Sequence, residues 1–370
     1  PRVGLSLLLV GRATPERMVG FSDHVDLGGV GRLRSDPALA ARLHYEDLPA
    51  TPPARLAVYL RGTAFEHYDG RAWSRAEGDP RPLQQRGRLT LLQRPPRPEE
   101  DRAVDVELQP IDPPVVFLPP NAVAIQVERA GNATNSPIPR LLGGPEDEVR
   151  YASPEERGLR YRVWTSATSE SPQAVVLSEE SRRRHLELPP KLPQRVSELA
   201  RTWAGALSDP FEQAAVIERR LRAEYRYDLA SPSGAAADPL DDFLFVSRRG
   251  HCEFYSTAMA VLLRTLGIPT RNVTGFAGAT FNSFGGFYSV RQGDAHSWVE
   301  AFLPGRGWVR FDPTPPSEVG PQAFDEGLSF RFREFMEALA RGYEHHVVGY
   351  NLHQQKIGRA SCRERVYHPV

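Results

Sequence analysis

Residues 250–267, with the sequence GHCEFYSTAMAVLLRTLG, combine a turn, a cysteine and an apolar helical pattern in immediate succession. Gly250 can adopt backbone angles that other residues avoid, so the chain can turn sharply there and begin a helix at Cys252. Gly267 predicts the end of that helix, and Pro269 prevents it from restarting. The helix is predicted to bury one stripe of apolar residues, which recur every fourth position: Phe254, Ala258, Leu262 and Leu266.

The position of Cys252 at the start of a helix favours a reactive thiolate. Unpaired amide N–H groups and the positive end of the helix dipole both stabilise negative charge on the sulfur, and the thiolate is the nucleophilic form. Taken alone, the pattern also fits a small buried residue, which is what most free cysteines are. This segment by itself therefore leaves a catalytic and a structural interpretation of Cys252 open.

A histidine and an aspartate follow in a strand-like segment. Residues 294–316, DAHSWVEAFLPGRGWVRFDPTPP, contain His296 and Asp312 among alternating aromatic and polar residues. Cysteine, histidine and aspartate in this chain order are the residue types of a nucleophile, a base that activates it and an acid that orients the base. The downstream segment therefore favours the catalytic interpretation.

Strand geometry decides whether His296 and Asp312 can meet. The segment predicts two antiparallel strands joined by a turn, with side chains alternating between the two faces. If Leu303 pairs with Gly307, His296 and Asp312 become diagonal neighbours on one face, about 7–8 Å apart between backbones. A plain four-residue loop that pairs Leu303 with Trp308 would put them on opposite faces. We therefore predict an odd-length loop, or a bulge at one of the two glycines.

Three blocks in this order resemble the core of the transglutaminase-like superfamily over about residues 200–316: EYRYDL, GHCEFYSTAMAVLLRTLGIPTRNVTGF and DAHSWVEAFLPGRGWVRFDPTPP. More closely, the chain resembles the extracytoplasmic region of bacterial membrane-anchored transglutaminase-like proteins of the TgpA type. The resemblance implies an α+β fold with a papain-like core, in which the helix that carries the cysteine packs on an antiparallel sheet. It also implies that Cys252 is the nucleophile, His296 the base and Asp312 the residue that orients His296.

The activity implied by this resemblance is acyl transfer on protein glutamine amides through a thioester. An amine acceptor such as lysine makes the enzyme a transglutaminase, whereas water makes it a peptidase or deamidase, and the sequence does not choose between these acceptors. The expected partners are a protein or peptide that donates glutamine and an amine that accepts the acyl group. The family also implies the periplasmic face of the bacterial inner membrane, with the membrane anchor outside this chain. A second hypothesis is a non-catalytic domain that binds cell-envelope protein or glycan; the presence of all three residue types disfavours it.

Composition argues against several other classes. The 46 basic residues balance the 46 acidic residues, which argues against nucleic acid or an anionic membrane surface as the main partner. Cys252 and Cys362 are the two cysteines, so we expect neither a disulfide framework nor a zinc-type cysteine cluster, and no cofactor. The apolar run at residues 3–10 is far shorter than the ~20 residues that span a bilayer. We therefore expect the chain to be a soluble part of a longer protein.

The length of 370 residues favours more than one domain. The predicted division is an N-terminal segment (1–46), a β-rich domain (47–172), a transglutaminase-like catalytic domain (173–320), a C-terminal helix towards the membrane (321–356) and a non-native tail (357–370). The β-rich domain is predicted to be sandwich-like, with strands at 55–65, 103–109, 115–118, 122–128 and 160–168. Helices are predicted between 178 and 207 and over 210–223, and the Ser-Asp-Pro motif at 35–37 predicts the start of a short helix.

Other residues near the candidates have plainer interpretations. His251, Trp298 and Trp308 are candidate neighbours in the cleft, where either tryptophan could shield the thiolate or line a path for the acceptor; core packing explains both tryptophans equally well. Trp73 is expected to be a core residue. The nearby residues that could bind a metal are His251, Cys252, His296 and Asp312. A metal site is disfavoured because the adjacent residues 251 and 252 would rarely both bind one ion, and because the four residues lack the spacing of a structural zinc site.

Overall fold

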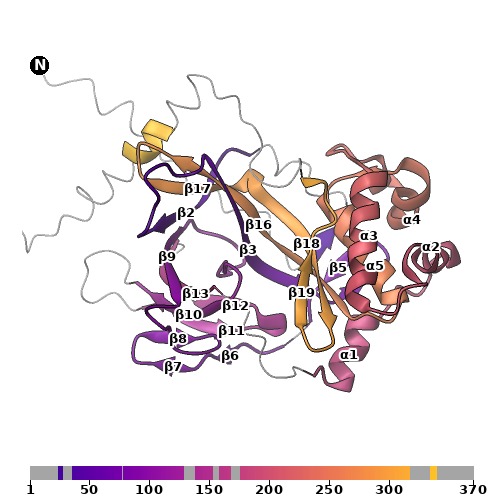
Figure 1. The fold of residues 1–370 in the computed structure, drawn as a ribbon, viewed down its shortest axis with the longest axis horizontal. Coiled ribbons are helices and arrows are strands. Elements are labelled where there is room, and N and C mark those ends of the chain that lie inside the picture. Colours follow the sequence, from indigo (N-terminus) through magenta and orange to yellow (C-terminus); the bar gives the residue numbers. More distant parts are fainter. Residues whose placement is uncertain are drawn as a thin grey trace, which may run out of the picture.

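An antiparallel sheet of eleven strands runs through the computed structural model and joins the two regions that the sequence divides (Figure 1). The structure describes residues 24–27, 36–76, 78–128, 138–152, 158–167, 176–316 and 334–339. The strands of the large sheet are β2 (Leu39–Tyr45), β3 (Arg55–Phe65), β7 (Gln85–Arg86), β8 (Leu89–Leu91), β9 (Asp101–Leu108), β10 (Ala122–Val127), β13 (Leu159–Ser166), β16 (Thr270–Asn282), β17 (Phe287–Arg291), β18 (Ala295–Leu303) and β19 (Gly307–Phe311). Their order is β19-β18-β16-β17-β2-β9-β13-β10-β8-β7, and β3 pairs with β16 outside this path.

Smaller sheets complete the β structure. One contains β1 (His24–Asp26), β5 (Ala72–Ser74) and β4 (His67–Tyr68), and another contains β12 (Val149–Ala152), β11 (Arg140–Gly143) and β6 (Arg81–Pro82). Strands β14 (Arg226–Tyr227) and β15 (Arg249–Gly250) form a short parallel pair just before the cysteine. The sheet of β6, β11 and β12 shares a hydrophobic core with β9 and β13, which gives the N-terminal region its sandwich-like form.

Strand β16 connects the two halves of the large sheet. Its first half pairs with β18, its last residues pair with β17, and β3 pairs along its length. Gly275 lies where β3, β16 and β18 run side by side, and a Cβ there would be 2.0 Å from the carbonyl oxygen of Leu60 and 2.7 Å from the ring of Trp298. Only glycine allows this close approach, because the space beside its Cα is already filled.

The helices gather at the end of the sheet that contains β18 (Figure 1). They are α1 (Glu179–Leu186), α2 (Gln194–Ala204), α3 (Pro210–Glu224), α4 (Pro239–Asp242) and α5 (Cys252–Thr265). Helix α5 packs against β16 and β18 on one side and against α2 and α3 on another. Trp73 of the hairpin β4–β5 is fully buried as expected, and its indole donates a hydrogen bond of 2.8 Å to Thr257 on α5.

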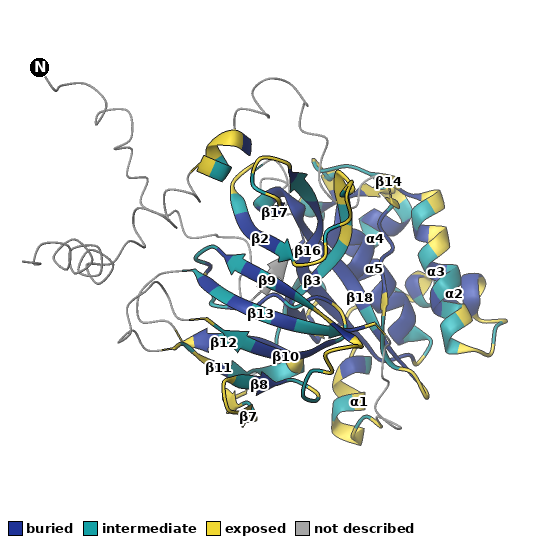
Figure 2. Ribbon diagram, turned by 60° about the vertical axis from the view of Figure 1, so that its left-hand side comes forward, coloured by how far each residue is buried: buried dark blue, intermediate teal, exposed yellow. Residues whose placement is uncertain are grey.

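The predicted stripe residues Phe254, Ala258 and Leu262 are buried, but the prediction that α5 buries only one stripe is wrong. Every residue from Cys252 to Arg264 is buried (Figure 2). The reason is tertiary: the sheet, helices α2 and α3, and the N-terminal hairpin cover different sides of the helix. Gly267 has a φ of +81° and ends the helix as predicted.

The predicted strands of the N-terminal region are confirmed, except that residues 115–118 make only isolated bridges. The helix predicted to start at the Ser-Asp-Pro motif is wrong, because Leu39–Tyr45 form strand β2. Strand β2 lies between β17 and β9 and pairs with both. These backbone hydrogen bonds on its two sides override the local helix signal. The large sheet thus crosses the predicted boundary at residue 172, and the division into domains stays a prediction.

Most of the predicted C-terminal helix and all of the predicted tail lie outside the described residues. Residues 334–339 form a helical turn near β16 and β17, where the backbone oxygen of Glu334 accepts a hydrogen bond from Asn282 and Glu337 pairs with Arg291. Within the part of the chain that the structure describes, none of the helices combines the length and apolar character needed to cross a bilayer.

Candidate active site

Cys252 is buried at the first residue of α5. His251 before it has extended backbone angles, and its carbonyl oxygen accepts hydrogen bonds from Phe254 and Tyr255. Gly250 does not use the left-handed angles that glycine permits. It is needed for space instead, because a Cβ would lie 2.9 Å from Cβ of Phe254 and 3.0 Å from the ring of Phe243. Tight packing of the turn therefore sets the start of the helix.

The turn between β18 and β19 has the predicted odd length. Leu303 pairs with Gly307, so three residues form the loop, and Gly305 and Gly307 both have positive φ. In this register Asp312, directly after β19, is the diagonal neighbour of His296 on β18, as predicted. The ring nitrogen Nε2 of His296 lies 2.7 Å from Oδ2 of Asp312. Both residues are buried.

The second ring nitrogen of His296 is left for the thiol. Nδ1 is buried and makes no hydrogen bond to a nitrogen or oxygen of the described residues. The Cys252 thiol lies close enough to the ring to help raise the pKa of His296. Because Nε2 is used by Asp312, Nδ1 is the ring nitrogen left for an interaction with the thiol.

The electrostatics of the His296–Asp312 pair favour a charged imidazole. Burial works to lower the pKa of His296, but the charge and hydrogen bond of Asp312, helped by Cys252, outweigh it and raise the pKa to about 9. Burial works to raise the pKa of Asp312, but His296, the hydroxyl of Tyr59 and the amide of Thr314 outweigh it and lower the pKa to about 2. At neutral pH the pair is therefore an imidazolium beside a carboxylate.

Residues that the sequence did not single out hold Asp312 in place. The amide N–H of Thr314 donates to Oδ1 at 3.0 Å, and the hydroxyl of Tyr59 donates to Oδ2 at 2.7 Å. On α3, Glu218 accepts a hydrogen bond of 2.8 Å from the Asp312 amide, and Arg222 donates through Nε to the Asp312 carbonyl at 2.8 Å. The tight Asp-x-Thr spacing could have indicated Thr314, but nothing local in the sequence marks the other three.

The other predicted neighbours separate in space. His251 is buried next to Cys252, with its ring edge-on to Phe254. Trp298 lies beside His296, with the two rings close to parallel and their centres 6.3 Å apart. Trp308 does not join them. It pairs with Phe302 at the turn end of the hairpin and contacts His185 and Arg271, so it belongs to another cluster.

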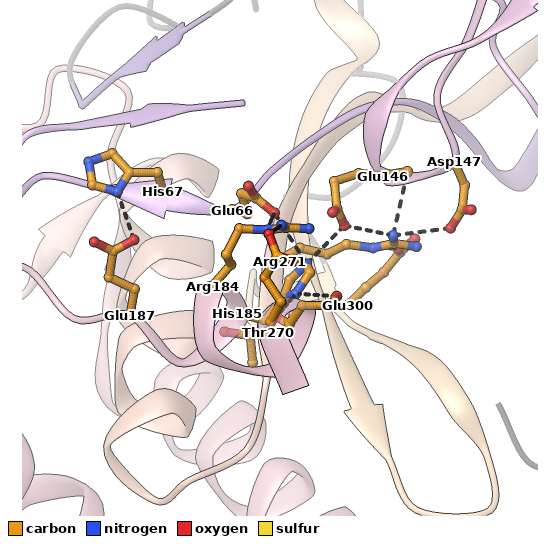
Figure 3. A network of polar contacts seen from close by, with 12 residues as sticks. Glu66, His67, Glu146, Asp147, Arg184, His185, Glu187, Thr270, Arg271 and Glu300 are labelled. Carbon is orange, nitrogen blue, oxygen red and sulfur yellow. Dashed lines mark hydrogen bonds and ion pairs between the residues drawn. The ribbon is translucent and has the colours of Figure 1, made fainter. Parts of the chain in front are cut away.

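That second cluster is the place among the described residues where metal-ligand atoms converge (Figure 3). Atoms of Glu66, Glu146 and His185 lie within 4.8 Å of one another. The carboxylates already have cationic partners, because Nη1 of Arg271 lies 3.0 Å from Glu146 and Nε of Arg184 lies 3.3 Å from Glu66. The guanidinium groups thus supply the positive charge that a metal ion would bring. The cluster is a network of ion pairs that links the N-terminal region, α1 and β16.

Comparison with known proteins gives matches over both regions. Residues 197–313 match the family model of the transglutaminase-like superfamily, and residues 1–172 match that of the TgpA N-terminal domain. The chain is 33% identical over 326 residues to a protein-glutamine gamma-glutamyltransferase of Pseudomonas aeruginosa, covering 87% of this chain and 44% of that protein. It is also 36% identical over 138 residues to the uncharacterized protein YebA of Bacillus subtilis, covering 35% of this chain and 19% of that protein.

The crystal structure of the periplasmic domain of TgpA from Pseudomonas aeruginosa superposes with a TM-score of 0.62 at 31% identity, covering 80% of this chain and 93% of that one. The chain spans less than half the length of the curated relatives named above. The matched fold, the two family models and the α+β architecture agree. This chain therefore belongs to the transglutaminase-like superfamily, among the proteins that carry a TgpA-type N-terminal domain.

Proposed function

We propose that this chain transfers the acyl group of a protein glutamine side chain to a primary amine through a thioester on Cys252. The observation that carries the proposal is the position of the His296 ring, which is hydrogen-bonded through Nε2 to Asp312 and keeps a buried Nδ1 without another partner among the described residues, with the Cys252 thiol nearby. The activity for which the Pseudomonas aeruginosa relative is named supports the choice of glutamine as the acyl donor.

In the first half-reaction the sulfur of Cys252 attacks the carboxamide carbon of glutamine. The carbon–nitrogen bond breaks, and His296 passes its proton from Nδ1 to the departing ammonia. Asp312 keeps the ring oriented and stabilises its positive charge before that transfer. The backbone N–H of Cys252, at the N-terminus of α5, is the expected donor to the oxyanion of the tetrahedral intermediate.

In the second half-reaction the amine nitrogen attacks the thioester carbon. His296 takes the amine proton on Nδ1, the carbon–sulfur bond breaks, and the thiolate of Cys252 leaves. The products are a secondary amide and the starting ion pair. Burial of Cys252 and His296 limits access of bulk water to the thioester.

The proposed location is the periplasmic side of a bacterial inner membrane, with the anchor in parts of the protein beyond this chain. The periplasmic origin of the matched crystal structure supports it. A periplasmic enzyme of this type would act on envelope proteins.

The experiment is incorporation of a fluorescent primary amine into a glutamine-rich protein such as casein. Wild type is expected to label casein, Cys252→Ala to lose labelling, and Cys362→Ser, the matched variant of the other cysteine, to retain it. Release of ammonia or peptide fragments without labelling would show a hydrolase instead. Labelling that survives in Cys252→Ala would contradict the proposal altogether.

A further inference from the structure

Tyr59 reaches the proposed triad from a distant part of the chain. Its hydroxyl donates to Oδ2 of Asp312 at 2.7 Å, although the two residues are 253 positions apart. Oδ2 is also the oxygen that lies 2.7 Å from Nε2 of His296. One carboxylate oxygen therefore accepts from both the imidazole and the phenol.

The sheet explains how Tyr59 arrives there. Tyr59 lies on β3 and pairs with Ala277 of β16, while Gly275, two residues earlier on β16, pairs with His296 of β18 on its other side. Without a side chain at Gly275, the Trp298 ring can lie across β16. The Tyr59 ring then meets that indole edge-on, with ring centres 5.3 Å apart.

Neighbouring groups fix the Tyr59 ring and keep it a donor. The guanidinium of Arg310 lies 3.9 Å from the ring centre. Burial first, and then the charge of Asp312, raise the pKa of the Tyr59 hydroxyl, while Arg310 and Arg222 oppose the rise. The hydroxyl therefore stays protonated across the neutral range and can only donate to the carboxylate.

We propose that Tyr59 is a positioning residue of the acyl-transfer site, which fixes the Asp312 carboxylate and shares its charge with His296. The inference rests on the proposed function, because it concerns the same site. By donating to Oδ2, Tyr59 weakens the pull of that oxygen on the imidazolium proton. It also fixes the carboxylate plane towards which the ring is aligned. The N-terminal region thus takes part in the chemistry of the core.

Other groups face this pair and have to be kept constant in a test. They are Cys252 from α5, Glu218 and Arg222 from α3, and Arg310 from β19. Tyr59→Phe leaves all of them in place and keeps the ring that packs on Trp298. Tyr288→Phe is the matched control: Tyr288 is a buried tyrosine of the same sheet, and its hydroxyl donates at 3.1 Å to the carbonyl of Pro53, away from Asp312.

The test measures the pH dependence of Cys252 alkylation by iodoacetate in a Cys362→Ser background. An anionic reagent is drawn to a thiolate that lies beside an imidazolium, so the rate falls when His296 loses its proton. In Tyr59→Phe the full charge of Oδ2 acts on His296 and raises its pKa. We therefore expect the alkaline limb of the alkylation profile to move to higher pH by about half a unit. We expect kcat for amine incorporation to fall about tenfold with KM unchanged. Tyr288→Phe should change neither.

Two results would overturn the role of Tyr59: alkylation and kcat profiles of Tyr59→Phe that coincide with the parent, or an equal shift in Tyr288→Phe. Failure of the proposed function has a different signature. In that case the parent incorporates no amine, or His296→Gln leaves its alkylation profile unchanged. If the parent incorporates no amine but its alkylation profile still depends on His296, the alkylation measurement alone can still test the role of Tyr59.

Discussion

Among the described residues, two buried histidines hydrogen-bond to a buried carboxylate, and the two pairs differ in what happens at the other nitrogen of the ring. In His296 the Nε2 atom meets Asp312 at 2.7 Å, and in His185 the Nε2 atom meets Glu146 at 2.9 Å. Nδ1 of His185 is taken up by the carbonyl oxygen of Ser181 at 2.7 Å. Nδ1 of His296 is left to a thiol. A buried pair is therefore a structural element when both nitrogens are committed, and a candidate for catalysis when one is kept for a nucleophile.

The charges around the two pairs differ as well. Arg271 contacts both Glu146 and Glu300 (Figure 3). Glu300 also pairs with Arg61 of β3. Burial works to raise the pKa of Glu146, but His185 and Arg271 outweigh it and hold the pKa far below its ordinary value. This network connects β3, β16 and β18 with α1. No comparable set of cations contacts the side chain of Asp312 among the described residues, so its charge is directed to His296.

The largest expected effect comes from removing each histidine. His296→Gln should lower amine incorporation roughly 10³-fold, because the proton acceptor is lost. His185→Gln should instead keep near-normal kcat while losing about 2 kcal/mol in the free energy of unfolding. Urea titration and steady-state kinetics on both variants give the two numbers. Equal loss of rate in both variants would show that the distinction between the pairs is wrong.

Glu146→Gln tests the structural pair from the other side. It leaves the buried guanidinium of Arg271 with less compensating charge, and we expect a loss of about 3 kcal/mol in the free energy of unfolding. The matched control is Glu180→Gln on α1, whose side chain is 76% exposed and pairs with Arg184. There the loss should stay below about 0.5 kcal/mol. If both substitutions cost the same, the network does not stabilise the fold as argued.

The smallest of these effects is in the pH dependence of activity. The pKa of His296 is raised to about 9, so the imidazolium persists through neutral pH and is lost as pH rises through that value. Activity should therefore fall by half near pH 9 in the wild type. Asp312→Asn removes the charge that raises the pKa, so its alkaline limb should move to lower pH, opposite to Tyr59→Phe. A kcat profile that stays flat beyond pH 10, or a limb that Asp312→Asn leaves in place, argues against the ion pair.

Local sequence signals were sufficient for one side of the site. Alternation along residues 294–312 left two registers open, and the requirement that His296 and Asp312 share one face selected the correct one. The start of α5 at Cys252 was likewise predicted correctly, although packing rather than backbone angle explains Gly250. Each of these features depends on residues that are close in the chain.

The remaining features depend on contacts between distant segments. A strand at 55–65 could be predicted, but its pairing with β16, and with it the role of Tyr59, could not. The segment SRRRHL around His185 has the composition of an exposed helix, yet its histidine is buried against Glu146. The full burial of α5 was missed for the same reason, since the covering hairpin comes from residues 67–74. Propensity describes one segment at a time, and these sites are made by several.

Strand β3 also covers the edge of β16 along most of its length. A fragment that begins after residue 172 would lack β3. The edge of β16 would then expose a long row of unpaired amide and carbonyl groups, which invites association with other chains. The two matched regions should therefore be expressed and engineered together. An exchange of N-terminal regions between relatives would have to preserve both strand β3, which pairs with the edge of β16, and the Tyr59 hydroxyl that β3 carries.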